Sequence, residues 1–157
     1  MGWGRRIFER FFEILTHPTI NVESFCKKWS VGKEKLYDIL NVLESIGFIR
    51  VIHYTKKRAL SGGKGAKIFL ADPGFYSIFH GSQGTLREGA VAACFQESGR
   101  EILACKDETE GDFVFEGAKL EIGGKTKERK KSDWVIRDDV EFATGNCIPL
   151  WMLGCMW

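Results

Sequence analysis

The chain has 157 residues, of which 44% are hydrophobic and 28% are charged, and its formal net charge is +2. This composition is typical of a folded globular protein and excludes an intrinsically disordered one, while the length suits one ordinary domain or two small ones. The longest apolar run, residues 148–153, is far too short to span a bilayer, so we expect no membrane partner.

Helical periodicity dominates the first third of the chain. Apolar residues recur at helical spacing with charged residues between them, and Gly47 ends the last of these runs. After Gly47 the apolar period changes to two, which is typical of strands. The pattern predicts helices at residues 5–16, 22–29 and 33–46, then a hairpin of residues 48–54 and 67–73 around a basic loop at residues 55–66. This order predicts a winged helix-turn-helix domain over residues 1–80.

The charge of this first part suits a nucleic acid. Residues 1–80 carry 13 Lys/Arg against 7 Asp/Glu, whereas residues 81–157 carry 10 against 14. In a DNA-binding winged helix, the third helix enters the major groove and the wing contacts phosphates. The candidate DNA-binding residues are Lys33, Lys35, Tyr37 and Asn41 on the helix, and Lys56, Lys57, Arg58, Lys64 and Lys67 on the wing. The alternative is a protein-binding winged helix, which Glu34 and Asp38 on the same helix favour.

The second part mixes helix and strand patterns, so the predicted fold class is α+β. A turn at residues 72–74 precedes one or two helical turns. The elements expected next are a helix at residues 83–98 and three short strands at residues 100–106, 111–117 and 118–124, the last two forming a hairpin.

Three carboxylates are expected to converge in this second part. Asp112 and Glu121 lie on the two strands of the hairpin, and Glu88 shares the apolar helix face of Val91 and Phe95. A carboxylate in an apolar strand must be paired, bound to metal or turned to water. Three hard oxygen ligands favour Mg²⁺ or Mn²⁺, which meets phosphate and activates water. The alternative is that Asp112 and Glu121 lie on a solvent-exposed face of the hairpin.

A lysine near the last acid would complete such a site. The sequence offers Lys125, four residues after Glu121, as the group that orients the nucleophile or neutralises the transition state. The predicted catalytic residues are therefore Glu88, Asp112, Glu121 and Lys125, with the three acids as metal ligands.

Five ordered sequence blocks carry a resemblance to a known family. They are residues 67–79, 84–88, 110–114, 121–125 and 146–154. Residues 20–157 resemble the domain of unknown function that follows the ATPase core of many bacterial and archaeal AAA-type ATPases, within the PD-(D/E)xK nuclease superfamily. The resemblance implies a restriction-endonuclease-like domain over residues 81–157, and an AAA-type ATPase module upstream. This chain has no Walker motif, so we expect no ATP site in it and a partner ATPase in cis or in trans.

The chain departs from the superfamily pattern at the lysine. In the signature one residue separates glutamate from lysine, whereas three residues separate Glu121 from Lys125. In a regular strand this spacing places the lysine about 13 Å from the glutamate, roughly twice the signature distance. Residues 125–133 are also short for the helix that normally follows the third strand, and a basic loop is the alternative.

Three functions stay open from the sequence. The first is a nucleic-acid-binding regulatory module with a nuclease-like fold and no catalysis. The second is an active Mg²⁺-dependent DNA endonuclease. The third is a protein-interaction module that docks an ATPase or a homodimer partner.

The remaining features concern compartment and core. Five cysteines without C-x-x-C spacing predict reduced thiols and no zinc site, and the N-terminus lacks a signal peptide's apolar core. We therefore expect a cytoplasmic protein. Residues 148–153 are expected to close the core, with Met156 and Trp157 as a candidate exposed patch.

Overall fold

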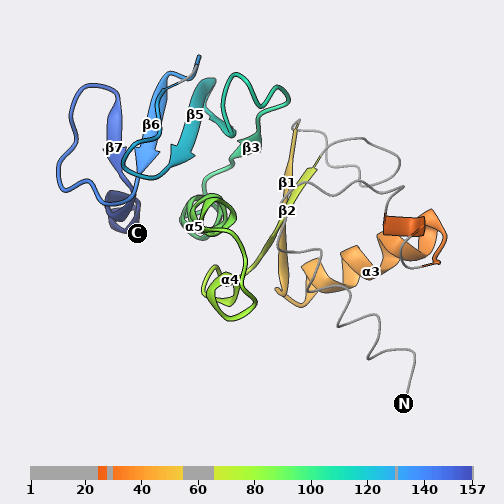
Figure 1. Cartoon of the computed structure of the whole chain (residues 1–157). Coiled ribbons are helices and arrows are strands. Elements are labelled where there is room, and N and C mark those ends of the chain that lie inside the picture. Colours follow the sequence, from red (N-terminus) through yellow and green to blue (C-terminus); the bar gives the residue numbers. More distant parts are fainter. Residues whose placement is uncertain (1–24, 28–29, 55–65, 130, 157) are drawn as a thin grey trace.

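The chain folds into an α+β structure, as predicted (Figure 1). The computed structural model describes residues 25–27, 30–54, 66–129 and 131–156. The helix predicted at residues 5–16 and residues 55–65 of the basic loop lie outside the described residues. Of the helix predicted at residues 22–29, residues 25–27 are described, and they are helical.

Helix α3, Lys33–Ser45, forms where its apolar period predicts it. Leu36, Leu40 and Leu43 occupy one face and are buried. The helix ends before Gly47, whose φ of +69° is a left-handed conformation that glycine adopts without a Cβ clash. The chain then reverses direction and enters the first strand, as the sequence predicted.

Strands β1, Ile49–His53, and β2, Ala66–Leu70, pair antiparallel with Ile49 opposite Leu70. Apolar residues predominate in both strands, and most of their side chains are buried. They confirm the predicted hairpin within its described part.

Helices α4, Phe75–Ile78, and α5, Gln83–Glu97, follow the hairpin. Helix α5 begins where the Ser82 hydroxyl accepts a hydrogen bond from the Thr85 N–H, which satisfies a donor of the first turn. Tyr76 of α4 is fully buried beside α5, and its ring lies 3.1 Å from the place that a Cβ at Gly89 would take. The absent side chain of Gly89 thus lets Tyr76 pack against the helix.

Tyr76 makes the stability of the protein sensitive to alkaline pH. Burial raises the pKa of Tyr76 to about 12, above its ordinary value of 10.0, while the phenolic oxygen accepts a hydrogen bond from the Leu70 N–H at 2.8 Å. The stabilisation from the neutral phenol is therefore complete below pH 10 and is lost as pH rises through about 12. A shift of this size corresponds to about 2–3 kcal/mol.

We expect the wild type to lose about 2–3 kcal/mol more unfolding free energy than Tyr76→Phe between pH 9 and 12. Urea denaturation of both proteins across this range measures the difference. The other groups of the chain are the same in both proteins, so parallel stability curves would contradict the assignment to Tyr76.

A second, five-stranded sheet forms in the C-terminal part of the described chain, in the order β3-β4-β5-β6-β7. Pairs β3–β4 and β4–β5 are antiparallel, and pairs β5–β6 and β6–β7 are parallel. The hairpin predicted at residues 111–124 is confirmed, and its turn at Glu116 and Gly117 has positive φ at both residues. The bounds are β3 Leu103–Ala104, β4 Phe113–Phe115, β5 Ala118–Gly123, β6 Trp134–Arg137, β7 Cys147–Pro149 and the 3₁₀ helix η1 Leu150–Cys155.

One buried cluster joins the hairpin, helix α5 and the five-stranded sheet. Phe69 of β2 packs against Phe113 of β4 with ring centroids 5.9 Å apart, and both side chains are fully buried. Figure 1 shows α5 lying between the hairpin and the sheet, and α5 contacts β2 and β5. The core thus crosses the boundary predicted between residues 80 and 81, and the division into two domains stays a prediction.

The C-terminal segment covers the core less completely than predicted. Leu153 is buried against the cluster, but Trp151 is 60% exposed and Met152 is 39% exposed. The expectation that residues 148–153 as a whole close the core is therefore wrong for these two side chains. Met156 is half-buried against the core, and Trp157 lies outside the described residues. In the described part of the chain, no helix is long and apolar enough to cross a bilayer.

Candidate functional site

A close approach of two backbones places Asp112 beside Glu121. The Asp112 N–H donates to the Leu120 carbonyl at 2.8 Å, and its own carbonyl accepts from the Cys105 N–H at 2.9 Å. A Cβ at Gly111 would lie 2.9 Å from the Leu120 carbonyl oxygen, and Gly111 has φ +154°. Glycine before Asp112 therefore permits the approach. The Asp112 carboxylate turns inward, and its Oδ2 accepts from the Ile122 N–H at 2.8 Å.

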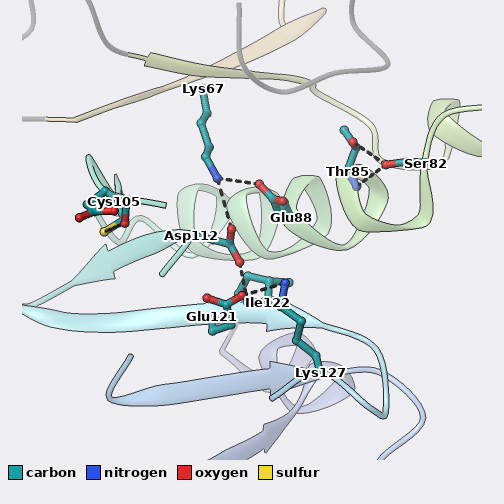
Figure 2. A network of polar contacts seen from close by, with 10 residues as sticks. Lys67, Ser82, Thr85, Glu88, Cys105, Asp112, Glu121, Ile122 and Lys127 are labelled. Atoms are coloured by element: carbon teal, nitrogen blue, oxygen red, sulfur yellow. Dashed lines mark hydrogen bonds and ion pairs between the residues drawn. The ribbon is translucent and has the colours of Figure 1, made fainter. Parts of the chain in front are cut away.

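The ammonium group of Lys67 links two of the three predicted acids (Figure 2). Its Nζ lies 2.9 Å from Glu88 Oε2 and 3.5 Å from Asp112 Oδ1. The side chains are 3% exposed for Lys67, 17% for Glu88 and 12% for Asp112. Buried charges are stable only when they are paired, so this lysine and the two carboxylates depend on each other.

The pKa shifts at this ion cluster follow from burial and charge. Burial raises the pKa of Glu88, and although the Lys67 ammonium opposes this effect, the pKa stays above its ordinary value. Burial lowers the pKa of Lys67, but attraction from Glu88 and Asp112 outweighs it, so the pKa lies above its ordinary value. Lys67 is consequently charged at neutral pH.

Glu121 has a lysine partner of its own. Its side chain is fully buried on β5, and Lys127 Nζ lies 2.8 Å from its Oε1. The hydrogen bond to Glu121 raises the pKa of Lys127 above its ordinary value. Lys127 follows a turn in which its N–H donates to the Gly124 carbonyl at 2.9 Å, so the chain folds back and directs the lysine toward β5.

Lys127 occupies the space that a side chain at residue 123 would fill. A Cβ at Gly123 would lie 2.8 Å from Lys127 Cδ and nearer still to Lys127 Cβ and Cγ, which no real side chain tolerates. Residues 121 and 123 are two apart on one strand, so their side chains share a face. The ammonium of Lys127 thus reaches Glu121 along the path that a lysine at residue 123 would take.

Two lysines therefore differ from the sequence-based assignments. Lys125 was predicted to be the lysine of the site, but its side chain is exposed, and Lys127 makes the ion pair with Glu121. Lys67 was predicted to contact nucleic acid on the wing, but it is buried between Glu88 and Asp112. The signal that was missed is Gly123, because an absent side chain beside a buried glutamate leaves room for a lysine from elsewhere.

The connection from β5 to β6 explains why Lys127, and not Lys125, contacts Glu121. Its described residues contain no helix, so the basic loop considered from the sequence is the observed structure. Arg87 of α5 holds the adjoining end of β6 through an ion pair with Asp138 at 2.5 Å, and its guanidinium lies against Gly124. A short loop anchored in this way brings Lys127 over β5.

The predicted nucleic-acid contacts divide by location. Lys33, Lys35 and Asn41 are exposed on α3, whereas Tyr37 is half-buried and packs against the core. The predicted wing residues Lys56, Lys57, Arg58 and Lys64 lie outside the described residues.

Carboxylates of this kind fit a hard divalent cation by their chemistry, since all three donors are oxygens. Among the described residues, however, no three His, Cys, Asp or Glu side chains are already arranged to hold a metal ion. In Figure 2 the Lys67 ammonium contacts Glu88 and Asp112, while Glu121 contacts Lys127. All five cysteines are free thiols.

Comparisons of the chain with protein-family models, with curated proteins and with solved structures give no match. The resemblance to the nuclease superfamily and to the ATPase-associated domain therefore stays a prediction.

Proposed function

We propose that this chain is a Mg²⁺- or Mn²⁺-dependent phosphodiester hydrolase acting on DNA, built as a winged helix followed by a PD-(D/E)xK-type nuclease domain. The observation that carries the proposal is the position of Lys127. Its side chain fills the space beside Glu121 where the nuclease signature would have its lysine, and its ammonium lies 2.8 Å from that carboxylate. The main departure of the sequence from the signature was the long spacing from Glu121 to Lys125. Lys127 removes this departure, because it takes the place of the signature lysine.

The three acids support the proposal because separate elements bring them together. Glu88 comes from α5, Asp112 directly precedes β4, and Glu121 comes from β5. The resemblance implies a helix followed by three strands, and α5 followed by β3, β4 and β5 has this order. Burying three carboxylates is costly, so their presence at one place favours a chemical role over a purely structural one.

The proposed role of each residue follows from its position in the site. A bound divalent ion would supply a Lewis acid for the phosphate and an activated water. Glu88, Asp112 and Glu121 would hold it through oxygen atoms. The Lys127 side chain is 37% exposed and contacts Glu121, so it offers positive charge to an approaching phosphate.

DNA is the proposed substrate because of the charge of the first half of the chain. Lys33 and Lys35 lie exposed on α3, and residues 1–80 have a clear excess of cations. Phosphate neutralisation by such residues supplies affinity that falls with salt concentration. An AAA-type ATPase in cis or in trans is part of the proposal only through the sequence resemblance.

A second candidate is a DNA-binding module without catalysis, and one observation favours it. Lys67 already forms ion pairs with Glu88 and Asp112, so the two acids have a partner without any metal. In that case the cluster would serve only to join the hairpin to the sheet.

Replacing Asp112 by asparagine tests the proposed function. The change keeps the shape of the side chain and removes its charge, so we expect loss of Mn²⁺ binding in calorimetry and a fall in cleavage of at least about 100-fold. Linear, supercoiled and single-stranded DNA with millimolar Mg²⁺ or Mn²⁺ are the substrates. Asp139→Asn is the matched control, because Asp139 is exposed and has a left-handed φ of 54° that asparagine accepts.

The outcomes separate the two candidates. Metal-dependent cleavage that Asp112→Asn abolishes and Asp139→Asn preserves supports the nuclease. DNA binding without cleavage and without metal binding in the wild type would contradict the nuclease and favour the non-catalytic module.

A further inference from the structure

The hairpin β1–β2, and not the five-stranded sheet, supplies the cation that pairs with Glu88 and Asp112. Lys67 is the second residue of β2, and its ammonium lies 2.9 Å from one carboxylate and 3.5 Å from the other. The same Nζ lies 5.3 Å from the centre of the Phe113 ring, whose face attracts cations. The buried ammonium thus has three favourable neighbours, namely Glu88, Asp112 and the ring of Phe113.

A divalent ion and this ammonium exclude each other. Mg²⁺ binds carboxylate oxygens at about 2.0–2.1 Å, closer than the ammonium lies, and prefers near-octahedral ligands. An ion shared by Glu88 and Asp112 would therefore occupy the space of Lys67 Nζ and repel its charge. The lysine stem has four rotatable carbons, so its ammonium group is able to leave while the strand keeps its place.

We propose that Lys67 is a built-in competitor for the metal, so that a divalent ion binds Glu88 and Asp112 only as the Lys67 ammonium withdraws. The inference rests on the proposed function of this site and adds its regulation. It also makes metal loading depend on the hairpin, because β2 carries the competitor.

Mn²⁺ binding by Lys67→Met measures this competition directly. Methionine keeps much of the length of the apolar stem and removes the charge, so we expect Mn²⁺ to bind at least about tenfold more tightly than in the wild type. Calorimetry and the loss of the free-Mn²⁺ paramagnetic resonance signal both report affinity without requiring cleavage. Lys119→Met is the matched control, since Lys119 pairs with Glu110 at the surface and contacts none of the three acids.

A structural ion pair predicts the opposite result. If Lys67 only holds the acids in place, Lys67→Met will bind Mn²⁺ equally or more weakly, and either result overturns the competition. If the variant unfolds without metal, refolding with Mn²⁺ but not with the same ionic strength of Na⁺ supports it, and failure of Mn²⁺ to refold it overturns it.

The two proposals can fail separately. Tighter Mn²⁺ binding by Lys67→Met without DNA cleavage by any variant keeps the competition and rejects the nuclease. Cleavage by the wild type with unchanged Mn²⁺ affinity in Lys67→Met keeps the nuclease and rejects the competition. Absence of Mn²⁺ binding in both proteins overturns both.

Discussion

Replacing Lys127 by alanine is expected to lower the rate of DNA cleavage by about two to three orders of magnitude, as loss of one transition-state charge partner does. Adding Gly123→Lys to this variant should restore much of the rate, because the removed side chain frees the space that the new one needs. Cleavage of supercoiled DNA under single-turnover conditions measures both changes. Gly123→Lys alone should be harmful, since two lysines would then compete for one volume.

The stability of the same variants tests, without requiring catalysis, whether a lysine at residue 123 replaces Lys127. Lys127→Ala removes the ammonium 2.8 Å from fully buried Glu121, so we expect the unfolding free energy to fall by about 1–3 kcal/mol and to recover in the double variant. Lys125→Ala is the control, because that side chain is exposed. Loss of activity in Lys125→Ala, or no recovery in the double variant by either measurement, would contradict the shared position of residues 123 and 127.

Phe69→Ala is expected to destabilise the whole described fold by about 3–5 kcal/mol, the usual cost of removing a buried aromatic side chain. Phe69 belongs to the hairpin, yet it packs on Phe113 of the sheet and lies 3.6 Å from the position of a Cβ at Gly89. The cavity would therefore open at the junction of both predicted domains. Guanidinium denaturation followed by circular dichroism measures the loss.

The same variant tests whether the two predicted domains unfold together. Because the core is continuous, amide exchange in β1 and in β5 should accelerate by the same factor in Phe69→Ala. Val42→Ala is the control, since Val42 is 58% exposed on α3 and its loss should change stability by no more than about 0.5 kcal/mol. Faster exchange confined to β1 would show two independently stable domains.

Several features of this protein were predictable from the pattern of residues that are close together in the sequence. The period of Leu36, Leu40 and Leu43 predicted α3, and Gly47 predicted its end, because side-chain spacing and a left-handed φ are properties of neighbouring residues. The hairpin at residues 111–124 was predictable for the same reason, and with it the proximity of Asp112 to Glu121.

The tertiary structure determines which lysines contact the three acids. Lys67 is 21 residues from Glu88 and 45 from Asp112 in the chain, so no spacing rule indicates their contact. It follows from the packing of β2 on α5 and β4. Lys127 reaches Glu121 because a short anchored loop folds back over a glycine, whereas Lys125, two residues earlier, points to solvent.

The sequence by itself determined the α+β class, helices α3, α4 and α5 and the two hairpins, since each depends on periodicity or turn chemistry over a few residues. It also predicted a site of three acids, Glu88, Asp112 and Glu121, which stays a prediction. Only the tertiary structure decided which cations those acids meet. A flexible lysine side chain binds wherever packing leaves a buried negative charge within reach, and that location depends on elements far apart in the chain.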